Sequence, residues 1–221
     1  MGVEIKICGI TTAEAADAAI QIGAGYAGLV FHPRSPRAIG PEQAKMLAGR
    51  LKGRARVVAL LADPDDAAIA AAISMAAPDF LQLHGRESVD RVAALRSRFG
   101  IPVIKAIAIA EAKDFAQVVG YEQVADMMLF DAKAPEGASR FGGNGAAFDW
   151  QLLRGLNFTR PWFLAGGLSA DNVGRAIRTS GASAVDVSSG VETEPGVKSA
   201  DLIRKFAAAA RAAAFAGGAD A

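Results

Sequence analysis

The sequence contains little of what marks several common classes of protein. It has one cysteine, Cys8, in 221 residues, so it cannot form an internal disulfide. Its 24 lysine and arginine residues nearly balance 23 aspartate and glutamate residues, and a net charge of +1 provides no basic surface for nucleic acid. The first residues lack the basic and then apolar order of a secretory signal, and no apolar run approaches the roughly 18 residues of a membrane span. We therefore expect a cytoplasmic protein that binds a small molecule, and neither nucleic acid nor a membrane.

Short aliphatic runs recur along the chain, and each is followed by a longer segment with helical spacing. This alternation is typical of βα units on a parallel sheet. The predicted strands are residues 4–8, 27–31, 57–61, 80–83, 103–106, 128–131, 162–164 and 184–187. They are apolar throughout, as expected of strands that are buried on both faces. The predicted helices are residues 12–22, 41–50, 65–76, 88–99, 111–119, 170–180 and 198–214, with a shorter one at 148–153.

Several of the predicted helices carry recognisable start signals. Thr12 can cap the first helix, and Pro41 occupies the first position of the second. Ser169 and Asp171 can cap the helix that follows the Gly-Gly turn. These signals support the boundaries of the βα units.

Eight such units without a break in composition indicate one closed (β/α)8 TIM barrel, with eight parallel strands inside a ring of helices. No linker rich in Pro, Gly or Ser divides the chain, so we expect a single domain over residues 1–221, with an alanine-rich helix and tail from about residue 207. The alternative is an open doubly wound sheet, which would normally carry a glycine-rich dinucleotide fingerprint after its first strand, where this chain has only Gly9. The longest connection, residues 132–147, is rich in glycine, and a loop of that length is usually functional.

Two reactive side chains close predicted strands that lie far apart in the sequence. Cys8 ends the first strand and Asp131 ends the sixth, so a closed barrel would bring both to one rim, where such folds carry out their chemistry. Lys6 beside Cys8 would favour the thiolate that a base needs, and apolar surroundings suit Asp131 to be a general acid. The alternatives are an inert buried thiol for Cys8 and a loop-capping role for Asp131.

The last two units contain the residues expected to hold a phosphate. In barrels of this kind the loops after strands seven and eight commonly do so, because glycines let backbone N–H groups approach the anion and a helix N-terminus favours its charge. The predicted cradle consists of Gly166, Gly167, Ser188, Ser189 and Gly190. Turns need glycine in any case, so the signal is the presence of both segments together.

Arginine and histidine side chains complete the predicted rim. Arg37 lies in a loop restricted by prolines and could hold a carboxylate or a phosphate through two hydrogen bonds, as could Arg34, although a solvated loop charge is the alternative for both. His84 is expected to orient a neighbour or to line the pocket, and His32 to be a loop residue. No second histidine or cysteine stands at ligand spacing, so we expect no metal site.

Together these segments resemble the phosphoribosylanthranilate isomerase family, the barrel enzymes of tryptophan biosynthesis, over nearly the whole chain. Several ordered motifs in the correct units make the resemblance specific, whereas the Gly-Gly turn alone would not. The matching motifs are Lys6-Ile7-Cys8-Gly9-Ile10-Thr11, Ser35-Pro36-Arg37, Gln82-Leu83-His84-Gly85, Phe130-Asp131, Gly142-Gly143-Asn144-Gly145 with Phe148-Asp149-Trp150, Ala165-Gly166-Gly167-Leu168, and Val185-Asp186-Val187-Ser188-Ser189-Gly190-Val191-Glu192.

The resemblance implies an Amadori rearrangement of N-(5-phosphoribosyl)anthranilate to 1-(2-carboxyphenylamino)-1-deoxyribulose 5-phosphate, with neither a metal nor an organic cofactor. Asp131 matches the general acid that protonates the furanose ring oxygen, and Cys8 matches the general base that removes the C2′ proton. Arg37 matches the group that holds the anthranilate carboxylate, with His84 and Asp186 expected to face the substrate. The implied phosphate-binding residues are Gly142, Gly143, Gly145, Gly166, Gly167, Ser188, Ser189 and Gly190. The choice between a monomer and a homodimer is left open.

Two other functions are left open by the sequence. The isomerase of histidine biosynthesis also performs an Amadori rearrangement in a phosphate-binding barrel, but its reaction looks like a task for two aspartates and its substrate carries two phosphates. Here the first strand ends in Cys8 and one phosphate site is indicated. The other function is a non-catalytic barrel that senses a sugar phosphate, which would not require a thiol and a carboxylic acid on opposite strands.

Overall fold

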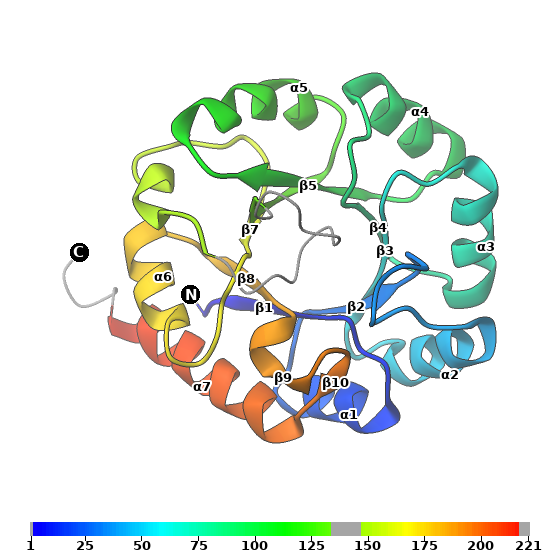
Figure 1. The fold of residues 1–221 in the computed structure, drawn as a ribbon, viewed down its shortest axis with the longest axis horizontal. Helices are drawn as coiled ribbons and strands as arrows, with labels where there is room; N and C mark the ends of the chain where they lie inside the picture. The colour runs from blue at the N-terminus through cyan, green and yellow to red at the C-terminus, as the bar shows by residue number, and fades with distance from the viewer. Residues whose placement is uncertain (1, 134–146, 217–221) are drawn as a thin grey trace.

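A closed barrel of parallel strands forms the centre of the protein (Figure 1). The computed structural model describes residues 2–133 and 147–216. Within these residues the strands pair in sequence order until the eighth closes on the first. The barrel strands are β1 (Glu4–Cys8), β2 (Tyr26–Val30), β3 (Arg56–Leu61), β4 (Phe80–Leu83), β5 (Val103–Ile109), β6 (Met127–Ala132), β7 (Trp162–Leu164) and β8 (Ala184–Val187). The expected (β/α)8 barrel is confirmed, and an open doubly wound sheet is excluded because β8 pairs with β1 and leaves the sheet without edge strands.

Helices cover the outside of the barrel (Figure 1). The α-helices are α1 (Ala13–Gln21), α2 (Pro41–Leu51), α3 (Asp66–Ala76), α4 (Val89–Phe99), α5 (Val118–Glu122), α6 (Val173–Ser180) and α7 (Ala200–Ala216). Short 3-10 helices are η1 (Ala112–Gln117), η2 (Trp150–Leu153) and η3 (Ser189–Val191). Among the helices that the structure describes, none combines the length and the apolar character needed to cross a membrane.

Two of the expected helix starts are correct and a third is not. Thr12 caps α1, its hydroxyl accepting a backbone N–H of the first turn at 3.1 Å, and α2 begins with its proline. The expected cap by Ser169 or Asp171 was wrong, because Asn172 stands immediately before α6. The Asn172 side chain accepts the Ser169 N–H at 2.8 Å and donates to the Gly167 carbonyl at 2.8 Å, which fixes the loop after β7.

Alternate residues of the strands enter two separate apolar layers. Residues on one side fill the inside of the barrel, and residues on the other side pack between the strands and the helices. The inner cluster consists of Tyr26, Val58, Ile104, Ala106, Met127, Leu129, Phe163, Ala165 and Ala184. It includes an edge-to-face contact between Tyr26 and Phe163, whose ring centroids lie 5.0 Å apart. Burial of both faces is the reason that the strands are apolar without alternation.

Three segments differ from the prediction. β5 continues to Ile109, beyond the predicted end at residue 106, because its ladder with β6 extends to the pair of Ile109 with Ala132. The predicted helix at 111–119 is instead η1 followed by α5, and the predicted helix at 148–153 is the 3-10 helix η2. Apolar spacing does not distinguish a short 3-10 turn from the first turn of an α-helix, which explains both differences.

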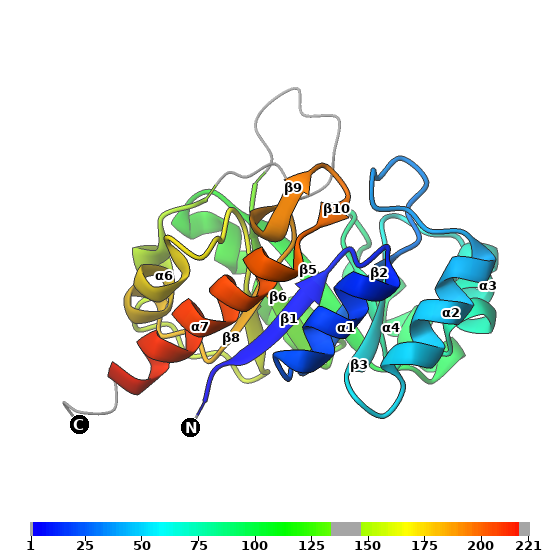
Figure 2. The same cartoon turned by 90° about the horizontal axis from the view of Figure 1, so that it is seen from below.

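A hairpin that the sequence did not lead us to expect follows β8. Its strands, β9 (Glu192–Glu194) and β10 (Val197–Lys198), are antiparallel and turn at Gly196, which has a φ of +89°. A Cβ at Gly196 would lie 2.5 Å from the carbonyl oxygen of Pro36, so the hairpin packs directly on the loop after β2. Figure 2 shows β9 and β10 at the carboxyl end of the barrel strands, on the same side as that loop.

Candidate active site at the carboxyl ends of the strands

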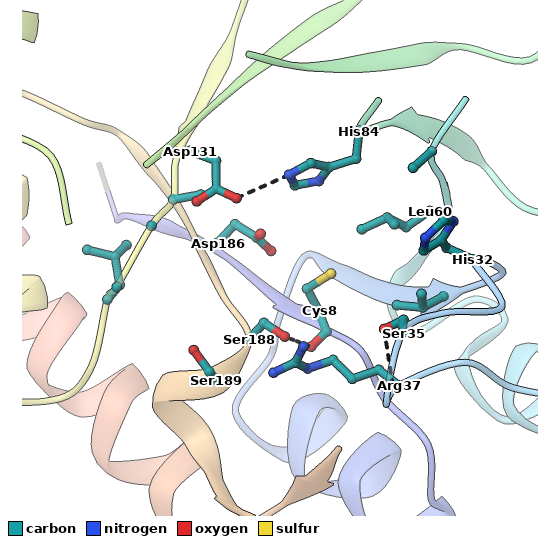
Figure 3. A pocket seen from close by; sticks show the side chains of 16 residues that line it. Cys8, His32, Ser35, Arg37, Leu60, His84, Asp131, Asp186, Ser188 and Ser189 are labelled. Carbon is teal, nitrogen blue, oxygen red and sulfur yellow. Dashed lines mark hydrogen bonds and ion pairs between the residues drawn. The ribbon is translucent and has the colours of Figure 1, made fainter. Parts of the chain in front are cut away.

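A pocket opens at the carboxyl end of the barrel and is lined from most of the strands or the loops that follow them (Figure 3). Its lining residues are Cys8, Val30, His32, Ser35, Arg37, Leu60, Ala62, His84, Asp131, Ala165, Gly166, Gly167, Leu168, Asp186, Ser188 and Ser189. Most residues that the sequence singled out therefore meet in one place. Gly142, Gly143 and Gly145 lie outside the described residues.

The two-residue period of the strands explains why these side chains face the pocket. Asp131 stands two residues after Leu129, and Leu129 belongs to the inner apolar cluster. Asp186 stands in the same relation to Ala184, another member of that cluster. Successive side chains of a strand alternate between its faces, so both carboxylates point inward above the apolar interior. The last inward-facing residue of each of these two strands therefore lies at the pocket.

Cys8 lies above a buried ion pair. Lys6 Nζ donates a hydrogen bond of 2.8 Å to Asp186 Oδ1, and the Lys6 side chain is fully buried inside the barrel. Gly28 on β2 leaves room for this arrangement, because a Cβ there would lie 2.9 Å from Cys8 Sγ and 3.3 Å from Lys6 Nζ. Ser188 Oγ donates to the Cys8 carbonyl at 3.1 Å, which links the end of β1 to the loop after β8.

Burial controls the charge state of the Cys8 thiol. Loss of water contact raises the pKa of Cys8 above its usual value of 9.0, and the nearby cations of Lys6 and Lys198 only partly oppose that change. Lys6 does favour the thiolate, as expected, but burial outweighs its effect, so the net change in the pKa of Cys8 is upward. Burial by itself would lower the pKa of Lys6, but Asp186 and Cys8 outweigh it and the pKa is raised, so the ammonium is charged.

Asp131 is held by hydrogen bonds to both of its oxygens. His84 Nε2 lies 3.1 Å from Asp131 Oδ2 (Figure 3). The backbone N–H of Ala132 donates to Oδ1 at 2.9 Å. Gln82, inside the barrel, places its Nε2 3.0 Å from His84 Nδ1. The His84 backbone N–H donates to the Leu61 carbonyl at 2.8 Å, which fixes the imidazole relative to β3. His84 thus orients a neighbour and also lines the pocket.

Arg37 is fixed by a carboxylate that the sequence did not single out for a role. Its Nε and Nη2 each donate to Glu192 at 2.7 Å, in the paired geometry that arginine makes with carboxylates. Lys198 also forms an ion pair with Glu192, and its Nζ donates to the Ser188 carbonyl at 3.2 Å. Burial would raise the pKa of Glu192, but Arg37 and Lys198 outweigh it and hold that pKa below 4.5. Glu192 is therefore ionised between two cations.

The loops after β7 and β8 approach each other closely at the pocket. Gly166 has a φ of +87°, and a Cβ there would lie 2.5 Å from the Ala132 backbone nitrogen. A Cβ at Gly190 would lie 1.9 Å from the Leu168 carbonyl oxygen. Gly190 is not among the lining residues, so its visible contribution is close packing between the two loops. Gly166, Gly167, Ser188 and Ser189 do line the pocket.

The residues missed by sequence reasoning are those that support the pocket from behind. Glu192 and Lys198 belong to the unpredicted hairpin, and Gly28 lies inside β2 without any turn to mark it. Gln82 could have been found, because a polar residue inside an otherwise apolar strand needs a partner. Across residues 2–133 and 147–216, no group of three or more His, Cys, Asp or Glu side chains is arranged to hold a metal ion.

Known proteins resemble this chain along nearly its whole length. The sequence pattern of the family described as N-(5'phosphoribosyl)anthranilate (PRA) isomerase matches residues 5–209. An N-(5'-phosphoribosyl)anthranilate isomerase of Bradyrhizobium sp. (strain ORS 278) is 53% identical over 213 residues, which are 96% of this chain and 97% of the relative.

Solved structures agree with the sequence comparison. The phosphoribosyl anthranilate isomerase of Thermotoga maritima superposes with a TM-score of 0.85 at 35% identity, covering 95% of this chain and 99% of that one. A second structure, of the isomerase in complex with reduced 1-(o-carboxyphenylamino)-1-deoxyribulose 5-phosphate, superposes with a TM-score of 0.80 at 32% identity, with the same coverage. The chain belongs to the N-(5'-phosphoribosyl)anthranilate isomerase family, whose reaction is a step of tryptophan biosynthesis.

Proposed function

We propose that Asp131 and Cys8 carry out the isomerase reaction of this family as its acid and its base. The substrate is N-(5'-phosphoribosyl)anthranilate, a furanose whose C1′ bears the anthranilate nitrogen. The observation that carries the proposal is that both side chains line one pocket, from β6 and β1, as Figure 3 shows. They approach it from different walls, as an acid and a base acting on two atoms of one sugar must.

Asp131 acts first, on the furanose ring. It donates a proton to the ring oxygen, the C1′–O bond breaks, and the lone pair of the anthranilate nitrogen forms an iminium with C1′. The substrate nitrogen accepts the charge, so the chain needs only to place the acid. The hydrogen bonds from His84 and Ala132 hold the carboxyl group in one orientation, which is the requirement for proton transfer at a fixed atom.

Cys8 acts second, on C2′. As a thiolate it removes the C2′ proton, and the electron pair moves into the iminium to give an enolamine, which tautomerises to the ketone. Because burial raises the pKa of Cys8, a smaller fraction of the thiol is ionised, and the thiolate that forms is a stronger base. Lys6, charged beneath the thiol, stabilises the thiolate when it forms.

The remaining pocket residues hold the two anionic ends of the substrate. Arg37 binds the anthranilate carboxylate, because its two bonds to Glu192 use two of five N–H groups and leave others to donate. The backbone and hydroxyl groups of Gly166, Gly167, Ser188 and Ser189 bind the phosphate, with Gly142, Gly143, Gly145 and Gly190 included in the same proposal. Asp186 faces the sugar from β8. The whole chain acts as one barrel domain in the cytoplasm, as a monomer or a homodimer.

The test is an activity assay in which N-(5'-phosphoribosyl)anthranilate is generated in the reaction mixture. Turnover removes the fluorescence of the anthranilate conjugate, so the wild-type protein should quench it. Asp131→Asn and Cys8→Ala should each lower kcat by about 10²- to 10⁴-fold. Asp17→Asn is the matched control, because Asp17 is an exposed aspartate paired with Arg50 on the surface. Wild-type kcat in either pocket variant would remove that residue from its role, and ligand binding without any turnover by the wild type would leave a sugar-phosphate sensor.

A further inference from the structure

Gln82 and His84 form a hydrogen-bonded chain that ends on Asp131. Gln82 Nε2 lies 3.0 Å from His84 Nδ1, and His84 Nε2 lies 3.1 Å from Asp131 Oδ2. Gln82 has 0% of its surface exposed, and within the described part of the chain its Oε1 has no hydrogen-bond partner. A buried polar oxygen without a partner costs free energy that an apolar side chain of the same size would avoid. The unpaired Oε1 of Gln82 therefore indicates a function for this side chain beyond packing.

The chemistry of the amide indicates where the protons lie, because an amide nitrogen can only donate a hydrogen bond. The Gln82 amide N–H donates to His84 Nδ1, so Nδ1 carries no hydrogen and the neutral ring holds its single proton on Nε2. Nε2–H donates to one oxygen of Asp131, and the Ala132 N–H donates to the other at 2.9 Å. Both carboxylate oxygens are acceptors. In this arrangement the one proton between the imidazole and the carboxyl group is that on Nε2.

General acid catalysis requires one more proton on the His84–Asp131 pair. This inference rests on the proposed role of Asp131 as the general acid. Both oxygens of Asp131 already accept N–H groups, so the extra proton is better placed on His84 Nδ1. Nδ1–H then needs an acceptor. A half-turn of the Gln82 amide exchanges Nε2 for Oε1, the atom that lacks a partner, and supplies one.

We infer that Gln82 is a positioning residue that, by turning its amide, sets whether the His84–Asp131 pair holds the proton used in ring opening. With Oε1 toward His84, the imidazole holds protons on both nitrogens. The Nε2 proton passes to Asp131 Oδ2, and Asp131 gives it to the ring oxygen of the substrate, which leaves a carboxylate and an imidazole protonated on Nδ1. Uptake of one proton from solvent at Nε2 restores the pair, and Cys8 releases to solvent the proton that it removed from C2′, so the reaction consumes no proton.

The surroundings hold the imidazole in place while the amide turns. Lys105 Nζ donates to the carbonyl oxygens on both sides of His84, to Leu83 at 3.2 Å and to Gly85 at 2.8 Å. The titratable and charged groups on the elements that pack around His84 are Asp131 on β6, Lys105 on β5, Asp63 after β3, His32 after β2, and Arg86 and Glu87 in the same loop as His84. Glu87 is engaged by Lys105 at 2.7 Å, and Asp131 is the group bonded to the imidazole itself.

Nitrogen NMR of the histidine rings tests the inference directly. The chain has two histidines, so a His32→Gln variant assigns the signals of His84. In wild-type protein the neutral ring should carry its proton on Nε2. Gln82→Met removes both the donor and the acceptor at similar size, and both neutral tautomers should then be present. Gln82→Glu offers only acceptors, so Nδ1 should carry a proton in that variant.

Steady-state kinetics separate this role from a structural one. Gln82 does not line the pocket, so Gln82→Met should lower kcat by about tenfold or more and change KM by less than about twofold. Leu81→Met is the control, because it is an equally buried change on the opposite face of β4 and should leave the His84 signals as they are. Lower kcat in Gln82→Met with wild-type His84 signals would overturn the inference, as would wild-type signals in both Gln82 variants.

The outcome for Asp131 is read separately. Wild-type kcat in Asp131→Asn would refute the proposed acid whatever the Gln82 variants do. An inactive Asp131→Asn together with unchanged His84 signals in the Gln82 variants would refute only the role of Gln82.

Discussion

Replacement of Lys6 by methionine should make Cys8 harder to ionise. Cys8 Sγ and Lys6 Nζ both lie close to the space left by Gly28, at 2.9 and 3.3 Å from the position of a Cβ there, so they are within about 6 Å of each other. At that separation and an effective dielectric constant of about 20, a unit charge on each contributes about 3 kcal/mol. Loss of this attraction should lower the thiolate fraction at neutral pH by at least about tenfold.

Alkylation by iodoacetamide measures this change without background, because Cys8 is the only thiol in the chain. The rate at neutral pH should fall in Lys6→Met, and its rise with pH should move to higher pH. A slower reaction cannot result from partial unfolding of the variant, because a loosened structure would expose the thiol and speed its alkylation. An unchanged pH dependence would refute the argument that Lys6 stabilises the thiolate.

The same substitution has a separate effect on stability. It leaves Asp186, whose side chain is only 8% exposed, without the Lys6 ammonium group that lies 2.8 Å from Oδ1. Breaking a buried ion pair in this way lowers the free energy of unfolding by about 3–5 kcal/mol. For a chain of this size the loss corresponds to a Tm lower by about 6–20 °C. Lys6→Met combined with Asp186→Leu removes both charges and should recover much of that loss. Equal Tm values for the single and double variants would contradict the buried-charge argument.

Three further predictions concern the supports of the pocket. Gly28→Ala should lower kcat by about tenfold or more, because its methyl group would displace Cys8 Sγ. Gly49→Ala on α2 is the control and should leave kcat unchanged, because the space around its new carbon is open. Equal kcat values for the two variants would contradict this prediction. Arg37→Ala should chiefly raise KM, and a fall in kcat at constant KM in steady-state kinetics would argue against carboxylate binding. Because the pKa of Glu192 lies below 4.5 in the folded chain, its contribution to stability is present above pH 4.5 and is lost as the pH falls further. Calorimetry should therefore show Tm falling more steeply with acid in the wild type than in Glu192→Gln.

The fold was predictable because its signals are local. A strand buried on both faces reads as an apolar run, and a helix start carries its own capping residue, so the eight units could be located from spacing alone. The short elements were not predictable in this way. η1 and η2 share the spacing of an α-helix, and the hairpin of β9 and β10 is held by its packing on the loop after β2.

The sequence by itself determined that Cys8 and Asp131 stand at strand ends and that a barrel would gather such ends on one rim. Only the tertiary structure decided what surrounds them. Glu192 reaches Arg37 from 155 residues away, and Asp186 reaches Lys6 from 180 residues away, through contacts that exist only once β8 closes on β1. The sign of the Cys8 pKa change followed from burial rather than from its neighbour in sequence, because loss of water contact outweighs the attraction of the nearby cations.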